Sequence, residues 1–162
     1  MRNMIAILRI LVTSFVIAGL ILQSTVIAHP AQQNALIVEF GTGGDDLRGG
    51  NDNVNLIVLL RGRSPIPFNN VNRGKRWGNN SIHTVSLPLP SNLKFGDIIG
   101  VRLETTFRGG YNGDNWNLNR LVVTERIGDQ DHQYQDRENV PFRFTGHERV
   151  LEFRYNTKDD RL

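Results

Sequence analysis

The chain has 162 residues, of which 39% are hydrophobic and 22% are charged, and its formal net charge is +3. This length suits a single domain, and the composition excludes a collagen-like repeat and a long disordered polyelectrolyte. Because the chain has no cysteine, a disulfide scaffold, a cysteine-ligated metal site and a cysteine nucleophile are excluded as well.

Residues 1–28 are typical of a secretory signal peptide. Arg2 and Arg9 supply positive charge, an apolar stretch covers residues 10–22, and Val26 and Ala28 occupy the small-residue positions of a cleavage site. We expect cleavage after Ala28 and export, to the outside of the cell or to the periplasm of a two-membrane bacterium. The alternative is retention of this segment as a membrane anchor, because its apolar part is nearly long enough to span a bilayer.

Removal of the signal changes the charge balance. Without Arg2 and Arg9, the 19 basic residues fall to 17, against 16 acidic residues, so the net charge of the mature chain is about +1. A charge so close to zero gives no general attraction to nucleic acid, which we therefore do not expect as a partner. After cleavage, no integral membrane span is expected either.

The mature chain shows short apolar runs separated by Gly, Asn, Asp and Pro, which is the pattern of β-strands. This pattern predicts an antiparallel β-sandwich of about seven or eight strands in one domain at residues 35–156. A short leader at 29–34 precedes it, and we expect a frayed, charged end at 157–162. The predicted strands are residues 35–40, 54–60, 82–89, 98–105, 116–125, 142–144 and 150–155.

Inside the fifth predicted strand, the inward-facing parity changes. In a regular strand, Trp116 and Leu118 would lie on one face, and Leu121 and Val123 would lie on the opposite face. A β-bulge near Asn119 would bring all four side chains inward. Trp116 is then expected to anchor the core, because an aromatic residue at inward parity usually buries.

Two loops have the composition of a calcium site. Residues 41–53 carry five glycines and three carboxylates, and residues 109–115 are similarly rich in Gly, Asn and Asp. Calcium binds carboxylate and carbonyl oxygens on flexible loops, so two such loops at one end of a sandwich could share an ion. The alternative is that Asp and Asn only form turns with their own backbone.

Several motifs resemble the PLAT (polycystin, lipoxygenase, alpha-toxin) domain. The W-x-L-x-x-hydrophobic-x-V spacing at 116–123 is similar to a PLAT strand, and 42–52 looks like the first Gly/Asp-rich loop of that family. Segments 93–101 and 114–116 match its Leu-Gly turn and Asp-Trp loop. The resemblance implies an eight-stranded β-sandwich that binds lipid surfaces or partner proteins, often with calcium. Its implied metal-binding residues are Asp45 or Asp46, Asp52, Asn112 and Asp114.

A basic segment around Trp77 suggests a ligand-binding loop. An exposed Trp77 beside Lys75 and Arg76 would suit an anionic lipid interface. Alternatively, Trp77 would stack on a sugar ring while Asn79 and Asn80 bind its hydroxyls. The third reading is that Trp77 folds back onto the sandwich, since Trp is highly buried on average.

Catalytic motifs are missing from the sequence. The histidines show no H-E-x-x-H spacing, and neither a G-x-S-x-G elbow nor a P-loop occurs. We therefore expect a secreted, non-enzymatic binding module that attaches to a lipid surface or an extracellular partner, possibly with calcium. A glycan-binding domain is the alternative, and a small secreted hydrolase is less favoured. The four histidines are His29, His83, His132 and His147.

Overall fold

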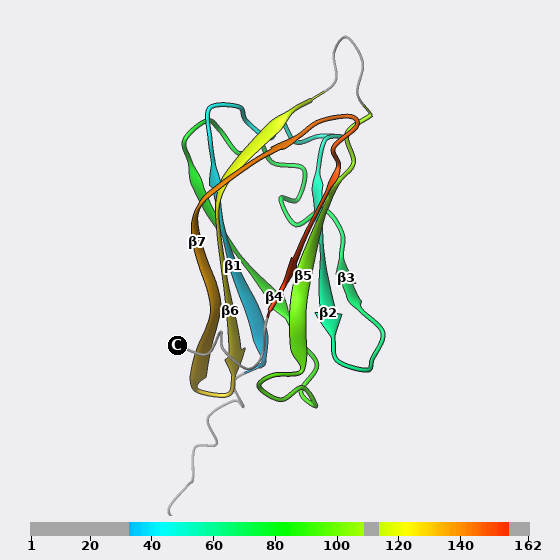
Figure 1. The fold of residues 1–162 in the computed structure, drawn as a ribbon, viewed down its shortest axis with the longest axis vertical. Coiled ribbons are helices and arrows are strands. Elements are labelled where there is room, and N and C mark those ends of the chain that lie inside the picture. Colours follow the sequence, from blue (N-terminus) through cyan, green and yellow to red (C-terminus); the bar gives the residue numbers. More distant parts are fainter. Residues whose placement is uncertain (1–32, 109–113, 156–162) are drawn as a thin grey trace, which may run out of the picture. The chain divides into compact units, whose positions relative to one another are not determined.

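The computed structural model describes residues 33–108 and 114–155, with only the backbone described for residues 135–140. The predicted signal at 1–28, most of the leader and the C-terminal end at 157–162 lie outside these ranges. The described chain forms eight strands and no helix (Figure 1). They are β1 (Ala35–Thr42), β2 (Val54–Leu60), β3 (Ile66–Phe68), β4 (Ile82–Pro88), β5 (Ile98–Thr105), β6 (Trp116–Ile127), β7 (Gln130–Phe144) and β8 (Val150–Arg154).

The strands build two four-stranded sheets. One sheet has the order β4-β1-β6-β7 and the other has the order β3-β2-β5-β8, and every neighbouring pair is antiparallel. The all-β antiparallel sandwich predicted from the sequence is thus confirmed. In residues 33–108 and 114–155, no helix has the length and apolar character needed to cross a membrane.

Four connections gather at one end of the sandwich, which is uppermost in Figure 1. These connections, which we call the loop end, are residues 43–53, 69–81 and 145–149, together with residues 106–108 and 114–115, the described parts of the connection between β5 and β6. Each of them passes from one sheet to the other. Asn34 and Tyr155 lie at the opposite end, where the Leu89 amide donates to the Asn34 carbonyl and the Tyr155 amide donates to the Ile99 carbonyl.

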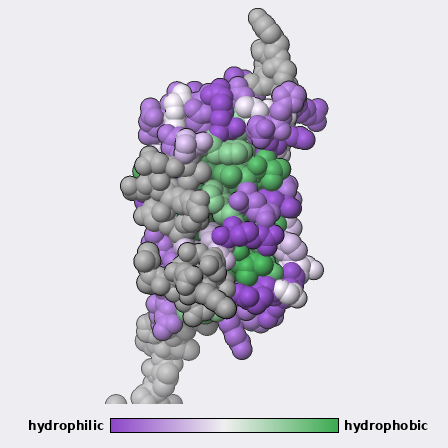
Figure 2. Space-filling view, in the orientation of Figure 1, coloured by the Kyte–Doolittle hydropathy of each residue, from purple (hydrophilic) through white to green (hydrophobic). Residues whose placement is uncertain are grey.

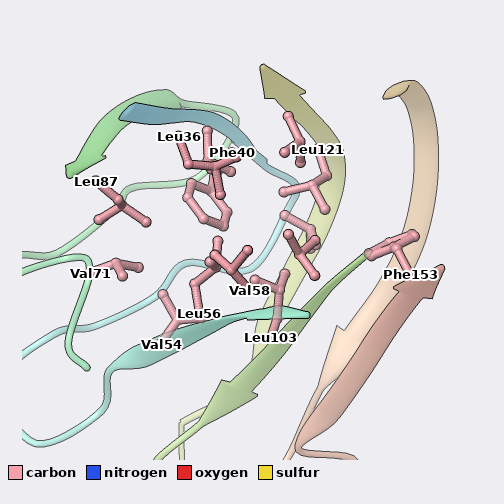
Figure 3. Close-up of a cluster of buried hydrophobic side chains, with 14 of the residues drawn as sticks. Leu36, Phe40, Val54, Leu56, Val58, Val71, Leu87, Leu103, Leu121 and Phe153 are labelled. Carbon is pink, nitrogen blue, oxygen red and sulfur yellow. The ribbon is translucent and has the colours of Figure 1, made fainter. Parts of the chain in front are cut away.

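The core lies between the sheets and follows strand alternation. On β1, Leu36, Val38 and Phe40 are fully buried, whereas the residues between them are half-buried. Leu56 and Val58 of β2 meet them from the other sheet (Figure 3). Alternation of this kind puts one set of side chains on the core face of each sheet.

Most of the strand predictions agree with the structure. The inter-strand register shifts between Leu118 and Arg120, which confirms a bulge at Asn119. Trp116 is fully buried and stacks on Phe144 with ring centroids 5.2 Å apart, so its role as a core anchor is also confirmed.

Two strand segments escaped the sequence prediction. β3 has three residues and contains Pro67, which favours turn over strand. The first half of β7 is polar because β7 is an edge strand, and Gln130, Asp131 and Gln133 are exposed. A two-residue loop, Gly128-Asp129, joins β6 to β7, with Gly128 at φ 57°. Such a loop is a hairpin signal that could have revealed this strand.

Candidate functional site at the loop end

The two Asp-rich loops meet at the side chain of Asp114. Its carboxylate accepts a hydrogen bond from the Arg48 backbone amide at 2.9 Å, and the Arg48 Nε lies 3.1 Å from its other oxygen. Asp114 is 2% exposed. Burial raises the pKa of Asp114, whereas the hydrogen bond and the positive charge from Arg48 oppose that rise. Asp114 therefore ties the 106–115 connection to the 43–53 connection.

Two further aspartates of the first loop are also paired with arginines. The Arg143 guanidinium lies 2.7 Å from the Asp45 carboxylate, and the Arg76 Nε donates to the Asp46 carboxylate. These arginines come from β7 and from the 69–81 connection, so each pair joins two segments distant in sequence. Two of the three carboxylates that suggested a cation in this loop are therefore balanced by guanidinium groups.

Three of the described residues predicted as calcium ligands already form ion pairs. Asp45, Asp46 and Asp114 each hold an arginine. Within residues 33–108 and 114–155, no group of three or more His, Asp or Glu side chains is close enough to hold a metal ion. Asp52 donates its backbone amide to the Gly49 carbonyl at 3.0 Å, as part of a tight turn. Asn112 lies outside the described residues.

The reading in which Trp77 folds back onto the sandwich is confirmed, and the exposed alternatives are wrong, because this side chain is only 4% exposed. Leu47 and Trp77 exchange two backbone hydrogen bonds of 3.0 and 2.8 Å, which hold the segment against the first loop. The indole packs on Phe40 and Trp116 and stacks on His83 with ring centroids 5.0 Å apart. Trp77 is therefore part of the core and does not present its ring to lipid or sugar.

The neighbours of Trp77 remain on the surface but do not act together. Lys75 is exposed and lines a groove, whereas Arg76 is paired with Asp46. Asn79 and Asn80 are exposed in a turn, where Asn80 has φ 53° and donates its amide to the Gly43 carbonyl. The predicted set of Lys75, Arg76, Trp77, Asn79 and Asn80 is thus not one site.

Exposed aliphatic side chains at the loop end were not identified from the sequence. Ile82 is 62% exposed and begins β4 directly after the 69–81 connection. Val150 is 52% exposed and begins β8 directly after the 145–149 connection. Strand alternation could have predicted that the Ile82 side chain points outward. That Ile82 and Val150 lie at the same end of the sandwich follows only from the order and direction of the strands.

The surface at this end is mostly hydrophilic (Figure 2), and it also carries exposed cations. Arg73, Lys75, Arg108 and Arg149 are exposed, and in the described part of the chain none of them takes part in an ion pair. The loop end therefore combines exposed apolar side chains with unpaired positive charge.

Comparisons with known proteins add information on the fold. A scan of family models and a search of curated proteins each gave no match. Among solved structures, the alpha-toxin of Clostridium absonum matches with a TM-score of 0.54 and 16% identity, over 75% of this chain and 31% of the toxin chain. A lipoxygenase matches with a TM-score of 0.49 and 13% identity, over 76% of this chain and 16% of the lipoxygenase chain.

These matches span less than a third of the toxin and less than a fifth of the lipoxygenase. At such low identity, they inform on the fold alone. The sheet order, the strand count and the toxin match agree with the resemblance found in the sequence. The described domain therefore has a PLAT-like β-sandwich fold.

Proposed function

We propose that this domain is an exported, non-catalytic module that attaches to a lipid surface through its loop end. The observation that carries the proposal is that two exposed aliphatic residues, Ile82 and Val150, lie at the same end of the sandwich as four cations that form no ion pair in the described residues. Apolar side chains of this kind enter the boundary between headgroups and acyl chains, and cations nearby attract anionic headgroups. An extracellular protein partner is the second candidate.

Attachment without calcium is part of this proposal. Calcium in such a module would bridge protein carboxylates to lipid phosphates. Here Asp45, Asp46 and Asp114 are each paired with an arginine. The positive charge that would attract lipid phosphates comes from exposed Arg and Lys side chains of the protein itself. Export rests on the sequence of residues 1–28 and is likewise proposed.

The local chemistry of His83 supports a non-catalytic role. The Ser81 hydroxyl donates its single proton to the Gly78 carbonyl at 2.5 Å, so at 2.8 Å it accepts from the His83 Nε2. A serine nucleophile needs the reverse arrangement, in which the imidazole accepts the hydroxyl proton. In the described residues, no hydrogen bond or ion pair joins His83 to an orienting carboxylate.

Sedimentation with lipid vesicles tests the proposal. We expect the mature protein to bind vesicles of phosphatidylcholine mixed with phosphatidylglycerol more tightly than vesicles of phosphatidylcholine alone, with binding weakened by salt. Ile82→Ser and Val150→Ser should each weaken binding about tenfold, from the loss of one inserted aliphatic side chain.

Phe95→Ser is the matched control, because Phe95 is 36% exposed and lies in the connection between β4 and β5, at the opposite end. This variant should bind like the wild type. Equal losses in Phe95→Ser and Ile82→Ser, or no sedimentation with either vesicle, would overturn the proposal.

A further inference from the structure

A groove of about 620 Å³ lies beside β4, next to the loop end, and shares Arg73 and Lys75 with it. Its walls come from residues 67–77 and from residues 83–87 of β4. Because β3 and β4 are edge strands of different sheets, the groove runs along an open side of the sandwich. Its volume falls in the range of small-ligand sites, which is about 300–1,000 Å³.

The charged side chains that line the groove are all positive. Arg73 and Lys75 line it, and none of its lining residues, all of which lie in the described part of the chain, is acidic. This arrangement differs from the neighbouring loop, where Arg48 and Arg76 are each matched by a carboxylate. An anionic group would therefore be attracted to this wall.

The opposite wall offers hydrogen-bonding groups next to apolar ones. Val85 and Phe68 are half-buried in the groove, while Thr84 and Ser86 lie at its rim on the opposite, exposed face of β4. Hydroxyl groups both donate and accept hydrogen bonds, and an aliphatic or aromatic surface packs against C–H groups. This mixture suits a ligand that is itself part polar and part apolar.

The imidazole of His83 adds one hydrogen-bond acceptor, its Nδ1 atom. The hydrogen-bond network assigns the proton to Nε2, which donates to Ser81, and burial lowers the pKa of His83, so the neutral ring leaves Nδ1 as an acceptor. Stacking on Trp77, with an interplanar angle of 12°, holds the ring in place. An acceptor in the groove favours a ligand that carries hydroxyl donors.

We propose that this groove binds an acidic carbohydrate, meaning a sugar that carries a carboxylate or sulfate group. Arg73 and Lys75 would bind the anionic group, the imidazole of His83 would bind a sugar hydroxyl, and Phe68 would contact the C–H face of the ring. The site differs from the exposed Trp77 that the sequence suggested, and it does not depend on lipid attachment at the loop end.

Isothermal titration calorimetry tests the inference with soluble probes. We expect trigalacturonate or a heparin-derived tetrasaccharide to bind the mature protein, and neutral maltotriose to bind at least about tenfold more weakly. Lys75→Gln and Arg73→Asn should each weaken binding of the acidic saccharide about tenfold. Asparagine is chosen at position 73 because Arg73 has φ 54°, a conformation that asparagine tolerates.

Arg149→Gln is the matched control, because Arg149 is an exposed cation of the loop end that does not line the groove. It should bind the saccharide like the wild type, as should Ile82→Ser. Equal binding of maltotriose, equal loss in Arg149→Gln, or no binding of either acidic saccharide would overturn the inference. Binding to phosphatidylglycerol vesicles alone would also overturn it while leaving the lipid proposal intact.

Discussion

Arg48 binds Asp114 twice, through its backbone amide at 2.9 Å and through its guanidinium Nε at 3.1 Å, although the two residues are 66 positions apart. We expect Asp114→Ala to lower the free energy of unfolding by about 1–3 kcal/mol, because the Arg48 amide would lose its buried acceptor. Urea denaturation measures this loss. Asp114→Asn keeps an oxygen acceptor and should lose less, so equal losses in both variants would contradict the role of the hydrogen bond.

Calcium should leave the melting temperature of the mature protein unchanged. A ligand raises the melting temperature only when it binds the folded state preferentially, and three of the candidate carboxylates are occupied by Arg48, Arg76 and Arg143. Differential scanning calorimetry in excess calcium, with magnesium and a chelator as references, measures the effect. A rise seen with calcium but not with magnesium would show that the loop end binds the ion after all.

Gly49→Ala should destabilise the protein by about 1–3 kcal/mol, since alanine is strained at positive φ. Gly49 has φ 78°, and a Cβ there would overlap the carbonyl oxygen of Gly74 in the facing connection. Gly44→Ala is the control, because a Cβ at Gly44 has no heavy atom within 4 Å. Thermal unfolding should separate the two variants, and similar melting temperatures would mean that the two connections are not held tightly together.

Stability should fall as the pH rises above the ordinary pKa of glutamate. Glu125 is fully buried and accepts a hydrogen bond from the Tyr134 hydroxyl. Burial raises its pKa above the ordinary value of 4.5, with the Tyr134 hydrogen bond opposing that rise. Above pH 4.5 the folded state therefore keeps a proton that the unfolded state releases. The contribution of Glu125 to the free energy of unfolding is fully present below pH 4.5 and is lost as the pH rises through the pKa of Glu125 in the folded state.

Glu125→Gln cannot ionise and should show a flatter dependence of unfolding free energy on pH across that window. Chemical denaturation of both proteins at a series of pH values measures the slopes. The comparison holds even if the substitution shifts stability by a constant amount. Parallel curves for the two proteins would assign the pH dependence to another group.

Local patterns predicted the strands, the bulge and the burial of Trp116, because alternation and parity depend on neighbouring residues. The position of Trp77 depends on backbone hydrogen bonds to Leu47, thirty residues earlier, which no local pattern reveals. The pairing of Asp45 with Arg143 is similarly remote in the sequence. Composition therefore indicated that the loop carboxylates need positive charge, whereas only the folded structure shows that Arg76 and Arg143 supply it to Asp46 and Asp45.

Asn34 and Tyr155, the residues near the two limits of the described domain, suit the attachment of a tether. Both residues lie at the end of the described sandwich remote from Ile82 and Val150. Tethering on either side, to a support or to another domain, would orient the loop end away from the attachment point. A tether attached at either residue would thus start far from Ile82 and Val150 and leave the loop end accessible.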